Sequence, residues 1–228
     1  ILFSYFEYFN KSRIGVLYKK SVRQYSSSGG MTEMKTEKIG SYRLALCALF
    51  AALSYAVFTF LQIKIPVGAD MTSIHLGNAV VVLAAFAIGG PLGGLAGAIG
   101  MSIGDLLDPV YFPLVPKTLF CKLMIGLISG FIAHKVGRIS YSTDRCHILF
   151  WTSLAAAAGL LFNVFADPIL GYYYKILILG KAAAELSLKI NFFASGVNAA
   201  VSLLVSVVVY MGLYPVLRKE SLELHPAV

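Results

Sequence analysis

The chain has few charged residues. Asp, Glu, Lys and Arg make up 13% of its 228 residues, whereas hydrophobic residues make up 58%. Because a soluble domain has roughly 25% charged residues, this composition excludes an ordinary soluble protein. Runs of about 20 apolar residues can cross a bilayer as helices. We therefore expect an all-α integral membrane protein that is surrounded by a lipid bilayer.

The sequence also lacks the motifs of common catalytic sites. The pair Gly180-Lys181 has no upstream glycine, so it does not match the phosphate-binding loop of nucleotide hydrolases. No zinc-protease motif is present. Asp105 follows a glycine, as in the loop of intramembrane aspartyl proteases, but Ser102 stands in place of the first glycine of that loop. We therefore expect no enzyme activity, no catalytic residue and no cofactor in this chain.

Cysteine is scarce. Cys47 and Cys121 fall within apolar segments, and Cys146 falls in a more polar one. Their spacing matches no metal-binding motif. A buried free cysteine behaves as a small apolar residue. The sequence therefore predicts buried, inert thiols, with neither a metal site nor a structural disulfide.

Six apolar segments are predicted to form a bundle of six transmembrane helices. The predicted spans are residues 44–61, 76–88, 92–107, 119–133, 148–166 and 192–217. Only Gly89-Gly90-Pro91 separates the second span from the third, so these two should form an antiparallel hairpin. Residues 171–189 contain three tyrosines and three lysines and are too polar for a span. We expect them to form an amphipathic segment that lies over the bundle.

The six spans make up one predicted membrane domain, residues 41–217. Residues 1–40 are expected to be an N-terminal extension, either disordered or upstream of the true start. Met31 and Met34 are the candidate first residues. Residues 218–228 are expected to form a cytoplasmic tail.

Lysine and arginine set the expected orientation in the membrane. The net charge of +8 comes mostly from the tail and short loops, a pattern of membrane topology signals rather than of nucleic-acid binding. Basic residues precede the first span, follow the fourth and end the sixth. These three groups lie on one side of a six-span chain. Because cytoplasmic loops are rich in Lys and Arg, we expect both termini to be cytoplasmic.

Polar residues within the spans gather toward the opposite, outer ends. An ionisable group inside a bilayer is rare unless it faces a cavity, an ion path or a partner charge. Helical spacing puts Thr118 above Lys122, and Asn163 above Asp167. We predict a polar pocket that opens outward and binds a small molecule. The predicted substrate-binding residues are His75, Asn78, Asp105, Tyr111, Thr118, Lys122, Asn163, Asp167, Asn191 and Asn198.

These polar residues have other interpretations. Small polar side chains often join membrane helices by hydrogen bonds, and tyrosines line bilayer interfaces. Lys122 could extend to the membrane surface, but a pocket role or an ion pair with Asp105 or Asp167 is favoured. The same acidic residues would also suit a solitary ion-coupled secondary transporter. That transporter is one alternative, and an intramembrane enzyme is another.

Small residues recur at helical spacing on the first span, at Ala48, Ala52 and Ala56. This spacing makes a groove that lets another helix approach closely. Glycines four apart, such as Gly90 and Gly94, make similar faces around the predicted hairpin. Such faces usually pack inside their own bundle. The alanine face is the best candidate for docking a separate subunit.

An ordered set of motifs is similar to that of a known family. The motifs are Ile74-His75-Leu76-Gly77-Asn78, Gly89-Gly90-Pro91-Leu92-Gly93-Gly94 and Gly100-Met101-Ser102-Ile103-Gly104-Asp105-Leu106-Leu107, followed by Tyr111, Pro116, Thr118, Lys122 and Gly126. The chain resembles the substrate-binding S components of energy-coupling factor (ECF) vitamin transporters, especially the riboflavin-transporter-like branch. The resemblance covers about residues 40–217.

The resemblance implies how the protein would work. It implies six helices, a vitamin site near the outer face and a multi-pass location in a prokaryotic plasma membrane. It also implies docking on an ECF T transmembrane subunit with two ATPase subunits, and it assigns Ala48, Ala52 and Ala56 to the T subunit. The ligands implied include riboflavin, thiamine precursors, pantothenate and related heterocycles. Relatives often have an acidic residue where Asn78 stands, so a charged ligand contact is expected to be lost there.

Overall fold

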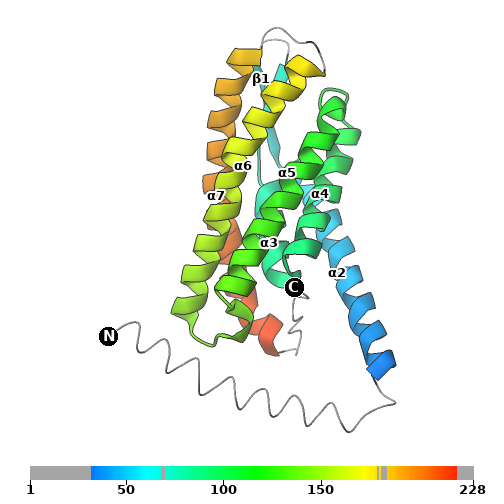
Figure 1. The fold of residues 1–228 in the computed structure, drawn as a ribbon, viewed down its shortest axis with the longest axis vertical. Helices are drawn as coiled ribbons and strands as arrows, with labels where there is room; N and C mark the ends of the chain where they lie inside the picture. Colours follow the sequence, from blue (N-terminus) through cyan, green and yellow to red (C-terminus); the bar gives the residue numbers. More distant parts are fainter. Residues whose placement is uncertain (1–31, 68–69, 179, 181–183, 220–228) are drawn as a thin grey trace. The chain divides into compact units, whose positions relative to one another are not determined.

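The computed structural model describes residues 32–67, 70–178, 180 and 184–219. This part of the chain forms six α-helices and one two-stranded antiparallel hairpin (Figure 1). The elements are α2 (Thr32–Phe60), β1 (Gln62–Val67), β2 (Asp70–His75), α3 (Gly77–Ile88), α4 (Gly90–Leu106), α5 (Val115–Gly130), α6 (Arg145–Leu177) and α7 (Ala184–Lys219). The described residues divide within α2, between Tyr42 and Arg43, into two units.

Four segments of the described chain are long and apolar enough to cross a membrane. They are residues 43–60, 112–136, 145–177 and 187–217. The fifth apolar helix, α3, has only 12 residues, and α4 has 17. A multi-helix membrane protein is therefore confirmed, while six full spans and the cytoplasmic position of both termini stay predictions. Most of the expected N-terminal extension lies outside the described residues. The same is true of nearly all of the expected C-terminal tail.

The helices α3, α4 and α5 approach one another through glycines. A Cβ atom at Gly93 of α4 would lie 2.3 Å from the backbone N of Ala85 in α3. A Cβ at Gly126 of α5 would lie 2.2 Å from the Cα of Gly94. Gly89, between α3 and α4, has a φ of 90°, a conformation that favours glycine. The predicted antiparallel hairpin is confirmed, and its contacts leave no room for side chains.

Strands β1 and β2 pair between α2 and α3, an element that the sequence did not predict. Gln62 pairs with His75 and Val67 with Asp70 in the antiparallel register. The segment alternates polar residues with β-branched ones, Ile63 and Ile65 in particular, which suits a strand. The fold is therefore mostly helical rather than all-α.

The prediction of an amphipathic segment over residues 171–189 is wrong. Helix α6 continues to Leu177, and α7 begins at Ala184. One buried polar pair in this region instead joins the two helices. The Nζ of buried Lys175 in α6 donates to the Oγ of Ser187 in α7 over 2.8 Å. This pairing lets both helices extend through residues that would otherwise suit an interface.

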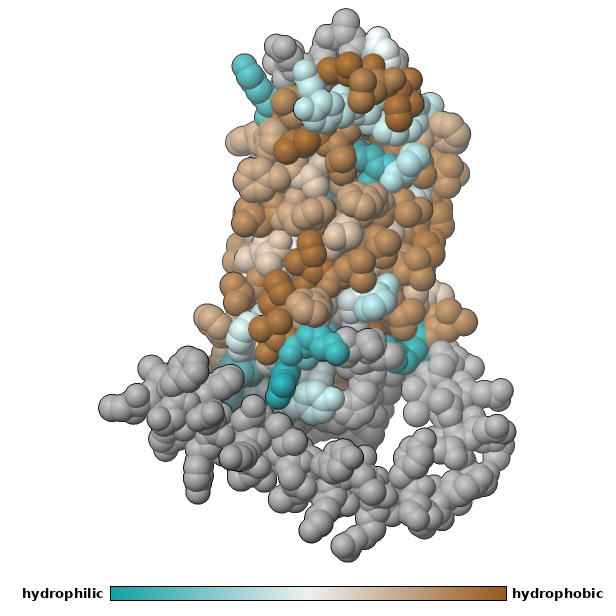
Figure 2. All heavy atoms as spheres, in the orientation of Figure 1, coloured by the Kyte–Doolittle hydropathy of each residue, from teal (hydrophilic) through white to brown (hydrophobic). Residues whose placement is uncertain are grey.

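The core lies among α3, α4, α5, α6 and α7, with Val81, Phe86, Met101, Ile125 and Leu160 all buried. Many large apolar side chains remain exposed, including residues 161, 165, 204 and 208. Figure 2 shows that such side chains cover the middle of the visible face, while hydrophilic residues gather near its ends. An exposed apolar band of this kind is expected where lipid surrounds a protein.

Candidate ligand-binding site

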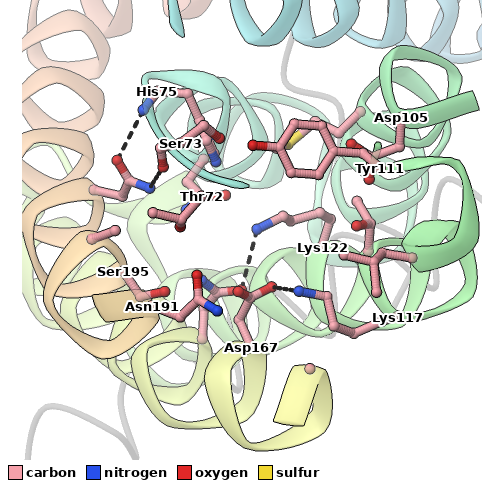
Figure 3. Close-up of a pocket in the computed structure, with 18 of the residues that line it drawn as sticks. Thr72, Ser73, His75, Asp105, Tyr111, Lys117, Lys122, Asp167, Asn191 and Ser195 are labelled. Atoms are coloured by element: carbon pink, nitrogen blue, oxygen red, sulfur yellow. Dashed lines mark hydrogen bonds and ion pairs between the residues drawn. The ribbon is translucent and has the colours of Figure 1, made fainter. Parts of the chain in front are cut away.

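A polar cavity lies where β2 and the ends of α4, α5, α6 and α7 meet (Figure 3). It contains about 670 Å³ of atom-free space, including the part that is open to the surface. The residues predicted to bind substrate all line it: His75, Asn78, Asp105, Tyr111, Thr118, Lys122, Asn163, Asp167, Asn191 and Asn198. The predicted convergence is therefore seen, and their contact with a ligand stays a prediction.

Several lining residues were not predicted. Lys117 and Lys175 face the same cavity, as do Thr72 and Ser73 of the hairpin. Lys117 directly precedes Thr118 at the start of α5, so its position near the predicted pocket was a usable signal. The strand residues gave a weaker signal, because Pro66 and a nearby glycine favoured a loop.

Lys117 and Asp167 form an ion pair inside the cavity. Their Nζ and Oδ1 atoms are 3.0 Å apart, and both side chains are largely buried. Lys122 lines the cavity, the first of its two favoured roles, whereas the alternative ion pair with Asp105 or Asp167 is not seen, because Lys117 pairs with Asp167. An ion pair in a low-dielectric site stabilises only when both charges stay together, and removal of one partner is costly.

Lys122 has a neutral partner instead of a carboxylate. Its Nζ donates to the Oδ1 of Asn163 over 3.3 Å. Lys122 lies two turns inside α5 and only 4% of its surface is exposed. Figure 3 shows its ammonium group reaching into the open centre of the cavity, between Tyr111 and Asp167. A lysine ammonium has three N–H donors, so this contact leaves donors directed at the space that a ligand would fill.

Asn198 holds the end of the hairpin against α7. Its Oδ1 accepts from the backbone N–H of His75 over 2.9 Å, and its Nδ2 donates to the carbonyl oxygen of Ser73 over 3.0 Å. The His75 ring also packs edge-on against Phe58 of α2, with 4.9 Å between ring centroids. Asn198 therefore positions one wall of the cavity.

Two buried polar atoms in the wall formed by β2 and α3 have no hydrogen-bond partner. They are the Nδ1 of His75 and the Oδ1 of Asn78. Their residues are 8% and 1% exposed. An unpaired polar atom in an apolar interior costs free energy unless a ligand or water satisfies it. Both residues line the cavity, so a bound ligand can supply the missing partners.

An ion pair lies near the rim of the cavity, outside the helices. Lys64 of β1 pairs with Asp108, which follows α4. Partial burial disfavours the charged form of Asp108. The hydrogen bonds from Lys64 and from the N–H of Val110 outweigh that effect and lower the pKa of this carboxyl below its ordinary value. The Lys64 Nζ also lies 5.8 Å from the centre of the Tyr111 ring.

Comparison with known families identifies the type of protein. A family model described as "ECF-type riboflavin transporter, S component" matches residues 38–215. The chain belongs to this family. The family is a substrate-binding component of a transporter rather than an enzyme, which agrees with the resemblance of the sequence motifs.

The solved structures include one similar fold. The structure of ThiT from Listeria monocytogenes shares 20% identity with this S component at a TM-score of 0.54, over 81% of this chain and 97% of that chain. At this identity the similarity shows the fold alone. A search of curated proteins finds no match.

The predicted docking face of the S component is open on α2. Ala48 and Ala52 are exposed, and Ala56 is half-buried. The other side of α2 packs inside the bundle, where Ser54 and Phe58 lie against glycines of α4. No described part of the chain covers the alanine face fully, and its contact with a T subunit stays a prediction.

Proposed function

We propose that this S component captures a water-soluble vitamin or vitamin precursor outside a prokaryotic cell membrane. It would then deliver the ligand through an ECF T subunit that is energised by two ATPase subunits. The main support is the cavity in which ten predicted polar residues meet, three of them with unpaired buried atoms. The ligand would exchange its hydration for hydrogen bonds in a site of low dielectric, where every unpaired group is costly.

Supporting features link the cavity to uptake. The ligand site lies at the ends of α4 and α6 and at the starts of α5 and α7. The alanine face lies on the exposed side of α2. Binding and docking therefore use different surfaces of the chain. We infer a membrane-embedded binding subunit that acts with partners and performs no reaction of its own.

The function can be tested by co-expression. The full chain would be produced with a T subunit and two ATPases, purified through a tag on this chain, and analysed by mass spectrometry. We expect the three partners to co-purify together with a heterocyclic vitamin or precursor. ATP-dependent uptake by the reconstituted complex would support the proposal. Uptake by this chain alone under a proton or sodium gradient would contradict it and favour a solitary secondary transporter.

A further inference from the structure

The cavity contains two buried charged groups that are not paired with each other. Within the described part of the chain, Lys117 and Asp167 form the cavity's ion pair, and neither Lys122 nor Asp105 has an oppositely charged atom within 4 Å. Asp105 is 3% exposed and lies beside the hydroxyl of Thr118. Buried charges are normally paired, so these two groups require an explanation.

The unpaired acceptors lie on one side of the cavity. Asn78 begins α3, where its Oδ1 is buried and without a partner. Asp105 ends α4, the helix that packs against α3. Lys122 comes from α5 and is a donor only. One wall of the cavity therefore presents hydrogen-bond acceptors, and another presents a cationic donor.

We propose that Lys122 and Asp105 are held apart in the ligand-free protein so that the ligand itself joins them. A carbonyl or carboxylate oxygen of the ligand accepts hydrogen bonds from Lys122. An N–H group of the same ligand donates to Asp105 and Asn78. The inference rests on the proposed capture function and specifies the ligand class: a molecule with an oxygen acceptor on one edge and an N–H donor on another.

This arrangement of a donor on one wall and acceptors on another should favour some classes of vitamin over others. The ring system of riboflavin carries two carbonyl oxygens beside a ring N–H, and pantothenate carries a carboxylate and an amide N–H. Thiamine is a cation without a carbonyl or carboxylate oxygen; its acceptors are ring nitrogens and a hydroxyl group, and its positive charge is repelled by Lys122. We expect the site to bind a ligand of the first type at least tenfold more tightly than thiamine.

Thermal unfolding of the purified, ligand-free full chain tests the inference without knowledge of the ligand. Replacing an unpaired buried charge by an apolar side chain of similar size should stabilise the protein. Lys122→Met loses the hydrogen bond to Asn163 but removes the larger cost of a buried charge without a counter-ion, so we expect it to raise the melting temperature by about 2–4 °C. The neutral, isosteric variant Asp105→Asn should act in the same direction. The matched control is Lys117→Met, which leaves Asp167 unpaired and should lower the melting temperature.

Titration calorimetry with riboflavin, pantothenate and thiamine provides the second measurement. Lys122→Met should weaken binding of the preferred probe at least tenfold, although the ligand-free protein has become more stable. A structural role for Lys122 would lower stability and affinity together.

The outcomes distinguish the inference from the function on which it rests. A drop in melting temperature for Lys122→Met as large as that for Lys117→Met would overturn the inference, and so would preferential binding of thiamine. In either case the capture function would stand, provided that a vitamin binds. If none of the three probes binds and no small molecule co-purifies, the capture function fails, and the inference fails with it.

Discussion

Asn198 offers the sharpest test of how the cavity is built. Its side chain makes two hydrogen bonds to the backbone of β2, at 2.9 and 3.0 Å. Each such bond contributes about 0.6–1 kcal/mol in a membrane protein. Removing the side chain also leaves the N–H of His75 buried without a partner, at a cost of about 1 kcal/mol or more. We expect Asn198→Ala to lower the free energy of unfolding by about 2–3 kcal/mol.

Two further variants separate the hydrogen bonds from the space that the side chain fills. Asn198→Leu keeps the volume and removes both bonds, so it should lose nearly as much stability as Asn198→Ala. Asn191→Ala is the matched control on the same helix, because the hydrogen bond that Asn191 donates within the described residues is to Ser187, one turn away, over 3.3 Å. We expect it to cost less than about 0.5 kcal/mol.

Denaturant unfolding in a mild detergent would measure these differences. Ligand affinity should fall with stability for both Asn198 variants, because the hairpin wall loses its attachment to α7. If Asn198→Leu unfolded like the unmodified protein, the two hydrogen bonds would not hold the hairpin and the reasoning would fail.

Three other predictions concern separate parts of the molecule. Gly126→Ala should lower the free energy of unfolding by about 2 kcal/mol or more, because the added Cβ would lie 2.2 Å from backbone. The control Gly196→Ala meets nothing within 4 Å and should be tolerated. Denaturant unfolding of both variants checks this. Ala52→Trp should abolish co-purification of the T subunit, while Leu204→Trp, at an exposed apolar position of α7, should not. The ion pair of Asp108 should stabilise the fold above the unfolded pKa of about 3.9 and lose this effect as the pH falls through the lower folded pKa. The stabilisation is about 1 kcal/mol or less for a pair near the surface. Asp108→Asn should remove the corresponding fall in melting temperature at acid pH.

Much of the helical fold could be predicted because it depends on local patterns. The Gly89-Gly90-Pro91 turn correctly placed the α3–α4 hairpin, since only glycine accepts the φ of 90° there. The cavity residues could be predicted because ionisable groups inside a membrane span are rare unless they face a cavity or a partner charge. These signals need no knowledge of how one helix is rotated against the next.

The pairing inside the cavity could not be predicted in this way. Whether Asp167 faces Lys117 or Lys122 depends on the rotation of α5 against α6, which sequence spacing does not determine. The extension of α6 and α7 was missed for a similar reason, because the ammonium group of Lys175 is buried against a partner, Ser187, on the neighbouring helix. The structural role of a buried polar residue therefore depends on partners that are distant in the sequence.

The walls of the cavity differ in how freely they can vary. Helices α3, α4 and α5 meet backbone to backbone at Gly93, Gly94 and Gly126, so almost any replacement there disturbs the packing. The β1–β2 hairpin is held to α7 by the side chain of Asn198, and its residues Thr72, Ser73 and His75 line the cavity. Ligand preference could therefore diversify through residues 70–75 while the helix contacts stay constant. Exchanging this hairpin between S components is a direct route to new specificities.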